Sequence, residues 1–405
     1  MNEEETQDQQ IQNRTKGAFI YKGPLKSAIE TARYYGFKLS PPLTITKRLP
    51  TTLTKAKREF LKEKDFSDFP KDYMSSLKKY IDDEMHKIPQ PIMVCHVIDR
   101  PNNWSELRLE IMGTEKSVAE ATIIKTASII LRDLGHRNIL IKLNSIGDKE
   151  SGNNFLKELM NYYREHINNL PPTIQQRLKK DILKIYANKS EKYKEINENA
   201  PKPISFLSEE SRKHFKQIIE FLENMEIDYE INEDLVGASP CFPKNLYEIL
   251  EKNKDGKEKI LAKGERYNYL AQNIGFNKKV PIVGIGINIK RKEKKKDSYV
   301  FKSTASSPKI YFIHLGFDAK KESLNILETF RKSKVPIYQS LCNDSFTHQL
   351  KNAESYHVPY TMIIGQKEVL EKTIIFRDMK TRYQENIELS NLETFLNRLK
   401  RKNVI

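Results

Sequence analysis

The residues best suited to chemistry in this sequence are cations. Six of the seven residues from Lys290 to Lys296 are basic, interrupted only by Glu293, and the chain has 70 Lys and Arg against 54 Asp and Glu, a formal charge of +16. Such an excess favours a polyanionic partner, with RNA or DNA ahead of an anionic membrane. A lysine-rich background and a solvated loop are the alternatives. The residues predicted to contact RNA are Lys290, Arg291, Lys292, Lys294, Lys295 and Lys296.

Histidine, cysteine and glycine give no pattern for another chemistry. The histidines are scattered without metal-ligand spacing, so no metal site is predicted. Cys95, Cys241 and Cys342 fit neither a disulfide framework nor a zinc knuckle, which favours a reducing cytoplasm. The segment 283–286 (Val-Gly-Ile-Gly) lacks the lysine, serine and third glycine of a phosphate loop.

Strands and helices must position these cations. The strongly apolar segment 280–287 predicts a buried strand directly before the basic run. Segments 92–98 and 107–112 predict an antiparallel hairpin around the polar turn 101–103. The single tryptophan, Trp104, lies at this turn, and its alternative roles are core packing and base stacking. Helices are expected at 24–35, 117–135, from the loop 144–148 to about 163, and 208–225, and further strands at 138–143, 227–231 and 246–250.

Composition divides the chain into parts. Residues 1–16 are polar and predict a disordered tail, and 17–300 form the larger folded part, with a small helical insertion at about 166–206. A Ser-rich linker at 301–308 precedes the last part, 309–405. There, strands at 310–313, 335–338 and 360–364 alternate with helices at 318–333 and 345–356. This alternation predicts βαβ units and a mostly parallel sheet. A strand pair (372–378 and 383–388) and a final helix (391–402) are expected after them.

A set of short segments, in order along the chain, carries a family resemblance. They are 89–91 (Pro-Gln-Pro), 99–101 (Asp-Arg-Pro), 109–114, 119–121, 144–148 (Asn-Ser-Ile-Gly-Asp), 266–270 (Arg-Tyr-Asn-Tyr-Leu) and 283–286, with 346–354 and 359–365 in the tail. From about residue 22 to 404 the sequence resembles the class II histidine–tRNA ligases, the histidyl-tRNA synthetase family, as a divergent synthetase-like paralogue. The resemblance implies an α+β fold: a class II aminoacyl-tRNA synthetase core, an antiparallel sheet flanked by helices, followed by an α/β anticodon-binding-type domain.

The resemblance also implies a homodimer and a reaction. Leu25 to Phe37 matches the helix at the family's dimer interface, and packing of this helix on its own sheet is the alternative. Forming an aminoacyl-adenylate brings a carboxylate to the α-phosphate of ATP, so fixed cations and Mg²⁺ must offset converging negative charge. The family uses three arginines for this purpose, because guanidinium groups stay protonated and hold phosphate with paired hydrogen bonds.

Two of the three arginine positions have lost their charge. Val97, in a strand expected to face the substrate, and Gly237 stand in two of them, whereas Arg291 retains the third and is the candidate nucleotide-binding residue. Cys241 and Phe242 replace the family's tyrosine pair.

Other pocket positions are mixed. Lys71 replaces a glutamate in an expected loop, Glu265 adds a side chain where a glycine belongs, and Glu106 replaces a glutamine. The remnants of the site are Glu110, a recognition carboxylate, with Arg266, Tyr267 and Arg291.

Two functions follow, from different classes. Losing one preorganised electrostatic group often lowers the reaction rate by ~10²–10³-fold, so the loss of two favours a pseudo-synthetase that is deficient in histidine activation. Such a protein would use no cofactor and would bind tRNA, another RNA or a protein partner. The alternative is an active, divergent histidine–tRNA ligase that uses ATP and Mg²⁺. Whether the chain is an enzyme therefore stays open at this stage. No apolar run approaches the ~18 residues of a membrane span, and a cytoplasmic location is expected.

Overall fold

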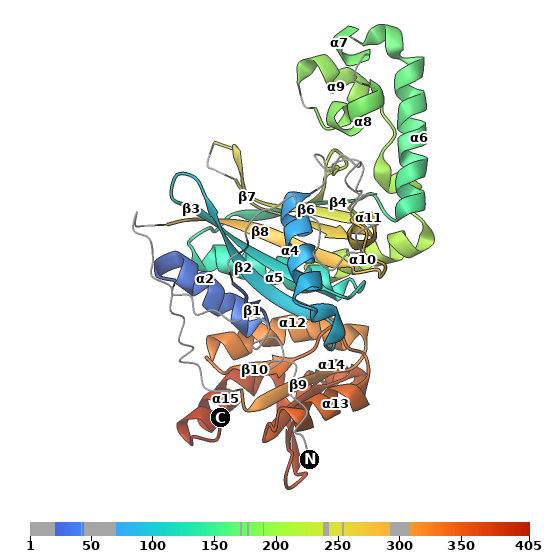
Figure 1. Ribbon diagram of the computed structural model, residues 1–405. Helices are drawn as coiled ribbons and strands as arrows, with labels where there is room; N and C mark the ends of the chain where they lie inside the picture. Colours follow the sequence, from blue (N-terminus) through green and yellow to red (C-terminus); the bar gives the residue numbers. More distant parts are fainter. Residues whose placement is uncertain are drawn as a thin grey trace.

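The computed structural model describes residues 21–41, 43, 70–170, 172–175, 178–188, 190–237, 243–252, 255–291 and 308–405. These residues form two sheets, each with its own helices, and a helical arm that projects from the larger part (Figure 1). The predicted tail 1–16, the linker residues 301–307, Cys241, Phe242, Lys292 and Lys294 to Lys296 lie outside the described residues. No helix of the described ranges is long and apolar enough to cross a membrane.

The large sheet is antiparallel through its centre. Its strand order is β1-β2-β3-β8-β7-β6-β4-β5, with parallel pairs at the two ends, β1 with β2 and β4 with β5. The predicted hairpin is confirmed, and its partner β8 is the buried apolar strand. The strand β7 was not predicted. The bounds are β1 Lys38–Leu39, β2 Ile92–Arg100, β3 Trp104–Met112, β4 Ile139–Ser145, β5 Tyr229–Ile231, β6 Asn245–Lys252, β7 Glu258–Tyr267 and β8 Ile282–Lys290.

Different helices cover the two faces of this sheet. On one face α2 (Gly23–Tyr34), α5 (Val118–Asp133) and α10 (Glu209–Asn224) bury their apolar sides against the strands. On the other face lie α4 (Lys71–Asp82), the 3₁₀ turn η1 (Met85–Lys87) and α11 (Leu270–Asn273), which share a second apolar cluster with Ile92, Val94 and Met112. The two faces of the sheet are therefore covered by different helices and belong to different apolar clusters.

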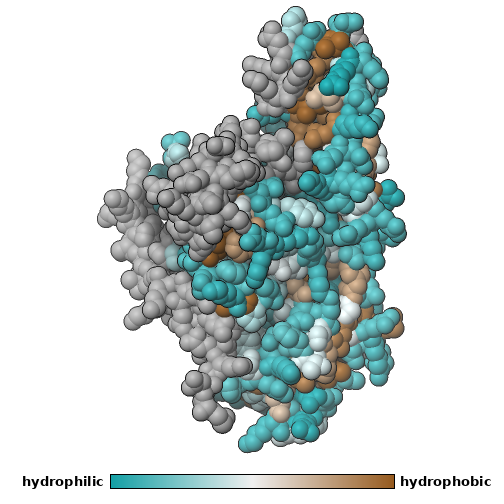
Figure 2. Space-filling model, turned by 45° about the vertical axis from the view of Figure 1, so that its right-hand side comes forward, coloured by the Kyte–Doolittle hydropathy of each residue, from teal (hydrophilic) through white to brown (hydrophobic). Residues whose placement is uncertain are grey.

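The expected insertion is helical and has a core of its own. It consists of η2 (Ile167–Asn169), α7 (Pro172–Gln175), α8 (Leu178–Tyr186), α9 (Glu191–Glu198) and η3 (Pro203–Phe206), and it packs on the preceding helix α6 (Lys149–Glu165) to form the arm. Phe155, Leu159, Tyr163 and Tyr186 pack together inside it. Hydrophobic side chains of this arm are visible in Figure 2, on a surface that is otherwise mostly hydrophilic from this side.

The C-terminal part confirms the predicted βαβ pattern. The strands β10, β9 and β11 are parallel, and β12 and β13 continue the sheet antiparallel. The short helix α14 and the 3₁₀ turn η4 were not predicted. The bounds are β9 Ile310–His314, α12 Phe317–Lys332, β10 Ile337–Gln339, α13 Phe346–Ser355, β11 Tyr360–Ile364, α14 Gln366–Glu371, β12 Thr373–Asp378, β13 Gln384–Glu388, η4 Leu389–Asn391 and α15 Leu392–Arg401.

Candidate functional site

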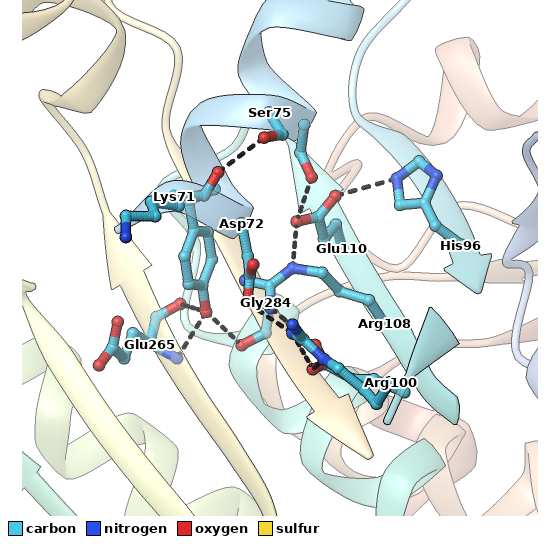
Figure 3. Close-up of polar contacts among 12 residues, drawn as sticks. Lys71, Asp72, Ser75, His96, Arg100, Arg108, Glu110, Glu265 and Gly284 are labelled. Carbon is cyan, nitrogen blue, oxygen red and sulfur yellow. Dashed lines mark hydrogen bonds and ion pairs between the residues drawn. The ribbon is translucent and has the colours of Figure 1, made fainter. Parts of the chain in front are cut away.

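A cluster of charged side chains lies on the α4 face of the large sheet. Side chains alternate between the faces of a strand, so Glu106, Arg108 and Glu110 of β3 point the same way. The neighbouring strand β2 adds His96 and Arg100. The first turn of α4 places Asp72 and Tyr73 over them (Figure 3).

Glu110 is completely buried, and both of its carboxylate oxygens are engaged. One accepts hydrogen bonds from Arg108 Nε and Ser76 Oγ, each at 2.7 Å, and the other lies 3.0 Å from His96 Nε2 (Figure 3). Burial alone raises the pKa of Glu110, but the His96 hydrogen bond and the Arg108 charge outweigh it and leave the pKa below the usual value. Glu110 is thus an ionised group with both oxygens engaged by its own chain.

The Arg108 guanidinium lies at the centre of the cluster. Its Cζ is 4.1 Å from the centre of the Tyr73 ring, which is a cation–π contact. Its Nη1 donates to Glu106 Oε1 at 3.2 Å and lies 3.5 Å from Asp72 Oδ2. The other oxygen of Glu106 is held by Arg100, with Nε at 3.0 Å. Two guanidinium groups are thereby compensated by three carboxylates.

The Tyr73 ring is fixed by backbone groups of two other strands. Its hydroxyl lies 2.9 Å from the carbonyl oxygen of Gly284 and accepts a hydrogen bond from the amide of Glu265 at 2.9 Å. The glycines of β8 make room for this arrangement, because a Cβ on Gly286 would collide with the Glu106 carboxylate. They serve close packing, as the sequence indicated.

Val97 contradicts the expectation that it faces the substrate. It pairs with Leu107 in the hairpin, and both side chains are buried in the core on the helical face of the sheet. The register follows from the short turn between β2 and β3, and it presents His96 and Arg100 to the α4 face instead. The loss of an arginine at position 97 therefore removes no charge from this face.

Gly237 and Lys71 stand at two other positions where the resemblance implied a different residue. A Cβ on Gly237 would collide with the ring of Pro243, so this backbone leaves no room for an arginine. The expected loop at Lys71 is wrong, since α4 begins there and Lys71 is exposed. The adjacent Asp72 points into the cluster instead (Figure 3).

Two of the four candidate residues lie away from the cluster. Arg266 is fully buried on the helical face, where its Nη2 is 2.6 Å from Glu120 Oε2 and its Nη1 donates to the Thr114 carbonyl at 2.7 Å. Arg291 pairs with Asp99 at 3.0 Å. Tyr267 borders the cluster, because its hydroxyl donates a 2.5 Å hydrogen bond to the Glu265 carboxylate. Burial raises the pKa of Glu265. Of the four candidates, Glu110 lies within it.

The outer edge of the sheet holds the other predicted contacts. Lys290, the last residue of β8, pairs with Trp104 across the ladder. Trp104 is partly exposed and lines a hollow with Lys259, Lys290 and Ile260. Lys259 Nζ lies 5.9 Å from the Trp104 ring centre. Both readings of Trp104, packing and base stacking, remain compatible with this position.

Asp72, His96, Arg100 and Arg108 were missed as site residues. One signal was available for Arg108: Glu106, Arg108 and Glu110 occupy alternate positions of a predicted strand, so three charges share one face. Asp72 gave no such signal, because α4 was not predicted.

The residues present do not fit an ATP–Mg²⁺ site as they stand. Within the described ranges, no group of three or more His, Cys, Asp and Glu residues is placed to hold a metal ion. Both guanidinium groups of the cluster are engaged by carboxylates. Arg100, the most exposed of these groups at 34%, is already paired with Glu106 and Asp72.

Comparisons with known proteins agree with this architecture. Residues 309–399 match the family model described as an anticodon binding domain. The histidine–tRNA ligase of Fervidobacterium nodosum is 29% identical over 293 residues, 72% of this chain and 69% of that protein. The ligase of Desulforamulus reducens is 24% identical over 339 residues, 81% and 80% of the two chains. Apo histidyl-tRNA synthetase of S. aureus aligns over 92% of this chain and 94% of its own, with 20% identity and a TM-score of 0.49.

The class follows from the antiparallel sheet with its flanking helices and from the matched C-terminal domain: this is a class II aminoacyl-tRNA synthetase-like chain with an anticodon-binding domain. Within that class the curated relatives are histidine–tRNA ligases. The chain is therefore histidyl-tRNA synthetase-like, at moderate identity to those relatives.

Proposed function

We propose that this chain is a pseudo-synthetase, which binds tRNA through a synthetase-like scaffold and does not activate histidine. The observation that carries the proposal is the saturation of Glu110 by Arg108, Ser76 and His96. Because both oxygens are engaged and the side chain is fully buried, an imidazole or an ammonium group reaches Glu110 only by displacing groups of this cluster.

The electrostatics of the cluster support the same conclusion. Adenylation needs preorganised cations at the developing negative charge. Here Arg100 and Arg108 each contact two carboxylates or more, and freeing either cation would leave those carboxylates partly buried without it. The energetic cost opposes the use of either arginine for phosphate.

The proposed partner is tRNA, bound by a basic two-domain chain. The anticodon-binding match, the +16 charge and relatives named as histidine–tRNA ligases support this assignment. We assign the domains as 17–300, with the helical insertion at 166–206, and 309–405, and include another RNA or a protein partner in the same function class. The run Lys290 to Lys296 is assigned to RNA contact.

We also propose that the chain forms a homodimer and works in the cytoplasm. In α2 the side chains of Leu25 and Ile29 are buried in the chain's own core and those of Lys26, Ser27 and Glu30 are exposed, so a dimer contact made by this helix would be polar. The buried free thiols Cys95 and Cys342 fit a reducing compartment. Light scattering of the purified protein tests the dimer, and a mass equal to one chain overturns it.

A divergent active ligase is the second candidate, favoured by one observation. Arg100 and Arg108 bring two guanidinium groups to the α4 face, and neither stands at one of the three arginine positions 97, 237 and 291. Repacking around ATP and Mg²⁺ would have to redirect at least one of them.

The exchange of labelled pyrophosphate into ATP, with and without histidine, tests the proposed function. We expect no histidine-dependent exchange and no charging of histidine tRNA, with an active histidine–tRNA ligase as the positive control. Histidine-dependent exchange that disappears in Glu110→Gln would establish the ligase instead, since that change removes the charge that Arg108 now holds.

A further inference from the structure

Arg108 is bound by its surroundings in the way that a guanidinium ligand is bound. Only 4% of its side chain is exposed. Carboxylates at Glu110 and Glu106 hold two of its nitrogens, Asp72 lies within ion-pair distance, and the Tyr73 ring covers its face. Carboxylates in the guanidinium plane and an aromatic ring above it are the general means of recognising this cation.

The groups that hold Arg108 are themselves held by other residues. Ser76 and His96 fix Glu110, and Arg100 fixes Glu106. The hydroxyl of Tyr73 is fixed by Gly284 and Glu265 (Figure 3). Such a second layer of contacts orients the groups that hold the cation independently of Arg108 itself.

Arg108 does not use the pocket fully. Its Nη2 is buried and has no hydrogen-bond partner in the part of the chain that the structure describes, and its Nη1 is 3.5 Å from Asp72, at the limit of a hydrogen bond. Its stem is anchored on β3, between Glu106 and Glu110 in the same strand, which limits how the fork can turn. A free guanidinium ion has no such restriction.

We propose that this pocket is a guanidinium-binding site occupied by Arg108 of the chain itself, an autoinhibitory contact that closes the site to free ligands. The pocket reaches solvent at Asp72 and Arg100, whose side chains are 28% and 34% exposed. The proposal concerns the same face of the sheet as the proposed function, but it describes what fills that face and does not depend on the outcome of the exchange assay.

Arg108→Ala tests the proposal, because it removes the guanidinium and leaves the holding groups. The probe is guanidinium chloride at 1–20 mM, about a hundredfold below denaturing concentrations, compared with sodium chloride at equal ionic strength. We expect R108A to melt at a lower temperature than the parent protein. Guanidinium should raise that temperature in a saturable way, half-maximal on the order of 1–10 mM as expected for so small a ligand. The parent protein should show no such rise.

Two further measurements keep the test decisive. In R108A/E110Q the guanidinium effect should be lost, while sodium chloride acts alike on both variants. If R108A is insoluble, the yield of soluble protein after dilution from urea, with guanidinium or with sodium chloride, gives the same comparison. A guanidinium effect that equals the sodium effect, or that survives in R108A/E110Q, overturns the proposal.

The two proposals fail separately. Histidine-dependent exchange by the parent protein would overturn the pseudo-synthetase proposal. A guanidinium effect on R108A would still support the guanidinium-binding pocket in that case. Absent rescue with absent exchange would overturn the self-occupied pocket alone.

Discussion

Arg266 matches a position of the family's substrate segment, yet its guanidinium holds the core together. It is fully buried between β7 and α5, bound to Glu120, to the Thr114 carbonyl and, at 3.2 Å, to the Lys116 carbonyl. Burial raises the pKa of Glu120, but the charges of Arg266 and His214 reverse the effect and keep that pKa far below the usual value. At the scale of one residue, partners decide between a catalytic and a structural role.

Replacing Arg266 with methionine should destabilise the fold strongly. The change leaves Glu120 buried without its main cation, which costs about 3–5 kcal/mol. The urea midpoint of unfolding, followed by circular dichroism, measures this loss. Lys263→Met in the same strand is the control, because its side chain is 64% exposed and surface changes stay within about 0.5 kcal/mol. Equal midpoints for the two variants would contradict a structural role for Arg266.

At the scale of elements, Asp148 joins the two helices that lead into and out of the insertion. Its carboxylate caps α6 by accepting from the Ser151 amide at 2.9 Å, and it also accepts from the hydroxyls of Ser208 and Ser211 at the start of α10. Burial raises its pKa, but these hydrogen bonds prevail and lower it to about 2. Gly147 permits the approach, since φ is +83° and a Cβ there would meet Ser151 and Leu207.

The contribution of Asp148 to stability should depend on pH in one direction. Its folded pKa of about 2 lies below the unfolded value of about 3.9, so the contribution is complete above about pH 4 and is lost as the pH falls toward 2. Asp148→Asn should lower the free energy of unfolding by about 0.5–2 kcal/mol at pH 6, as for a lost helix cap.

Urea unfolding at several pH values measures this difference. The gap between the parent protein and D148N should narrow below pH 4, whereas Asp228→Asn, at an exposed aspartate, should leave stability nearly unchanged throughout. A gap that is constant from pH 6 to pH 2.5 would contradict the assignment.

At the scale of the whole molecule, the C-terminal part is docked on the helices of the large sheet. Gln339 Nε2 donates to the Tyr35 carbonyl at 3.0 Å, and the Tyr35 hydroxyl donates to Glu328 at 2.9 Å. Arg331 pairs with Asp133 at 2.9 Å, and buried residues of both parts share one apolar cluster. The contacts place α12 against α2, below the sheet in Figure 1. The two parts are thus held together by hydrogen bonds, an ion pair and apolar contacts.

Binding of tRNA should weaken steeply with salt. Each lysine or arginine that neutralises a phosphate releases a counterion, so the logarithm of the affinity falls by about 0.7–0.9 per contact for each tenfold rise in salt. Filter binding or fluorescence anisotropy between 50 and 300 mM salt measures this slope.

A pair of variants locates part of that slope. Lys294→Ala with Lys295→Ala should reduce the slope by about 1–2 if the basic run contacts phosphate. Lys213→Ala with Lys216→Ala removes the same charge from exposed positions of α10 and serves as the matched control. Binding that is absent, or insensitive to salt, would instead favour a protein partner.

Periodic segments were the most predictable part of this chain. The hairpin β2–β3, the apolar strand β8 and the βαβ units of the C-terminal part are apolar runs bounded by turn residues or segments with helical spacing, both of which are local signals. The strand β7 was missed because charged residues interrupt its pattern (Glu-Lys-Ile-Leu-Ala-Lys-Gly-Glu-Arg-Tyr). It is a strand because β6 and β8 pair with it on both sides.

The site was less predictable than the elements that carry it. Family relationship, the order of segments, the excess of positive charge and the change at Gly237 followed from the amino-acid order, because motifs and composition are local properties. Which face Val97 and Arg108 occupy, and that Arg108, Ser76 and His96 engage Glu110, depended on strand register and on the placement of α4 across the sheet. A one-residue change of register exchanges the two faces of a strand, so only the paired sheet decides which charges meet.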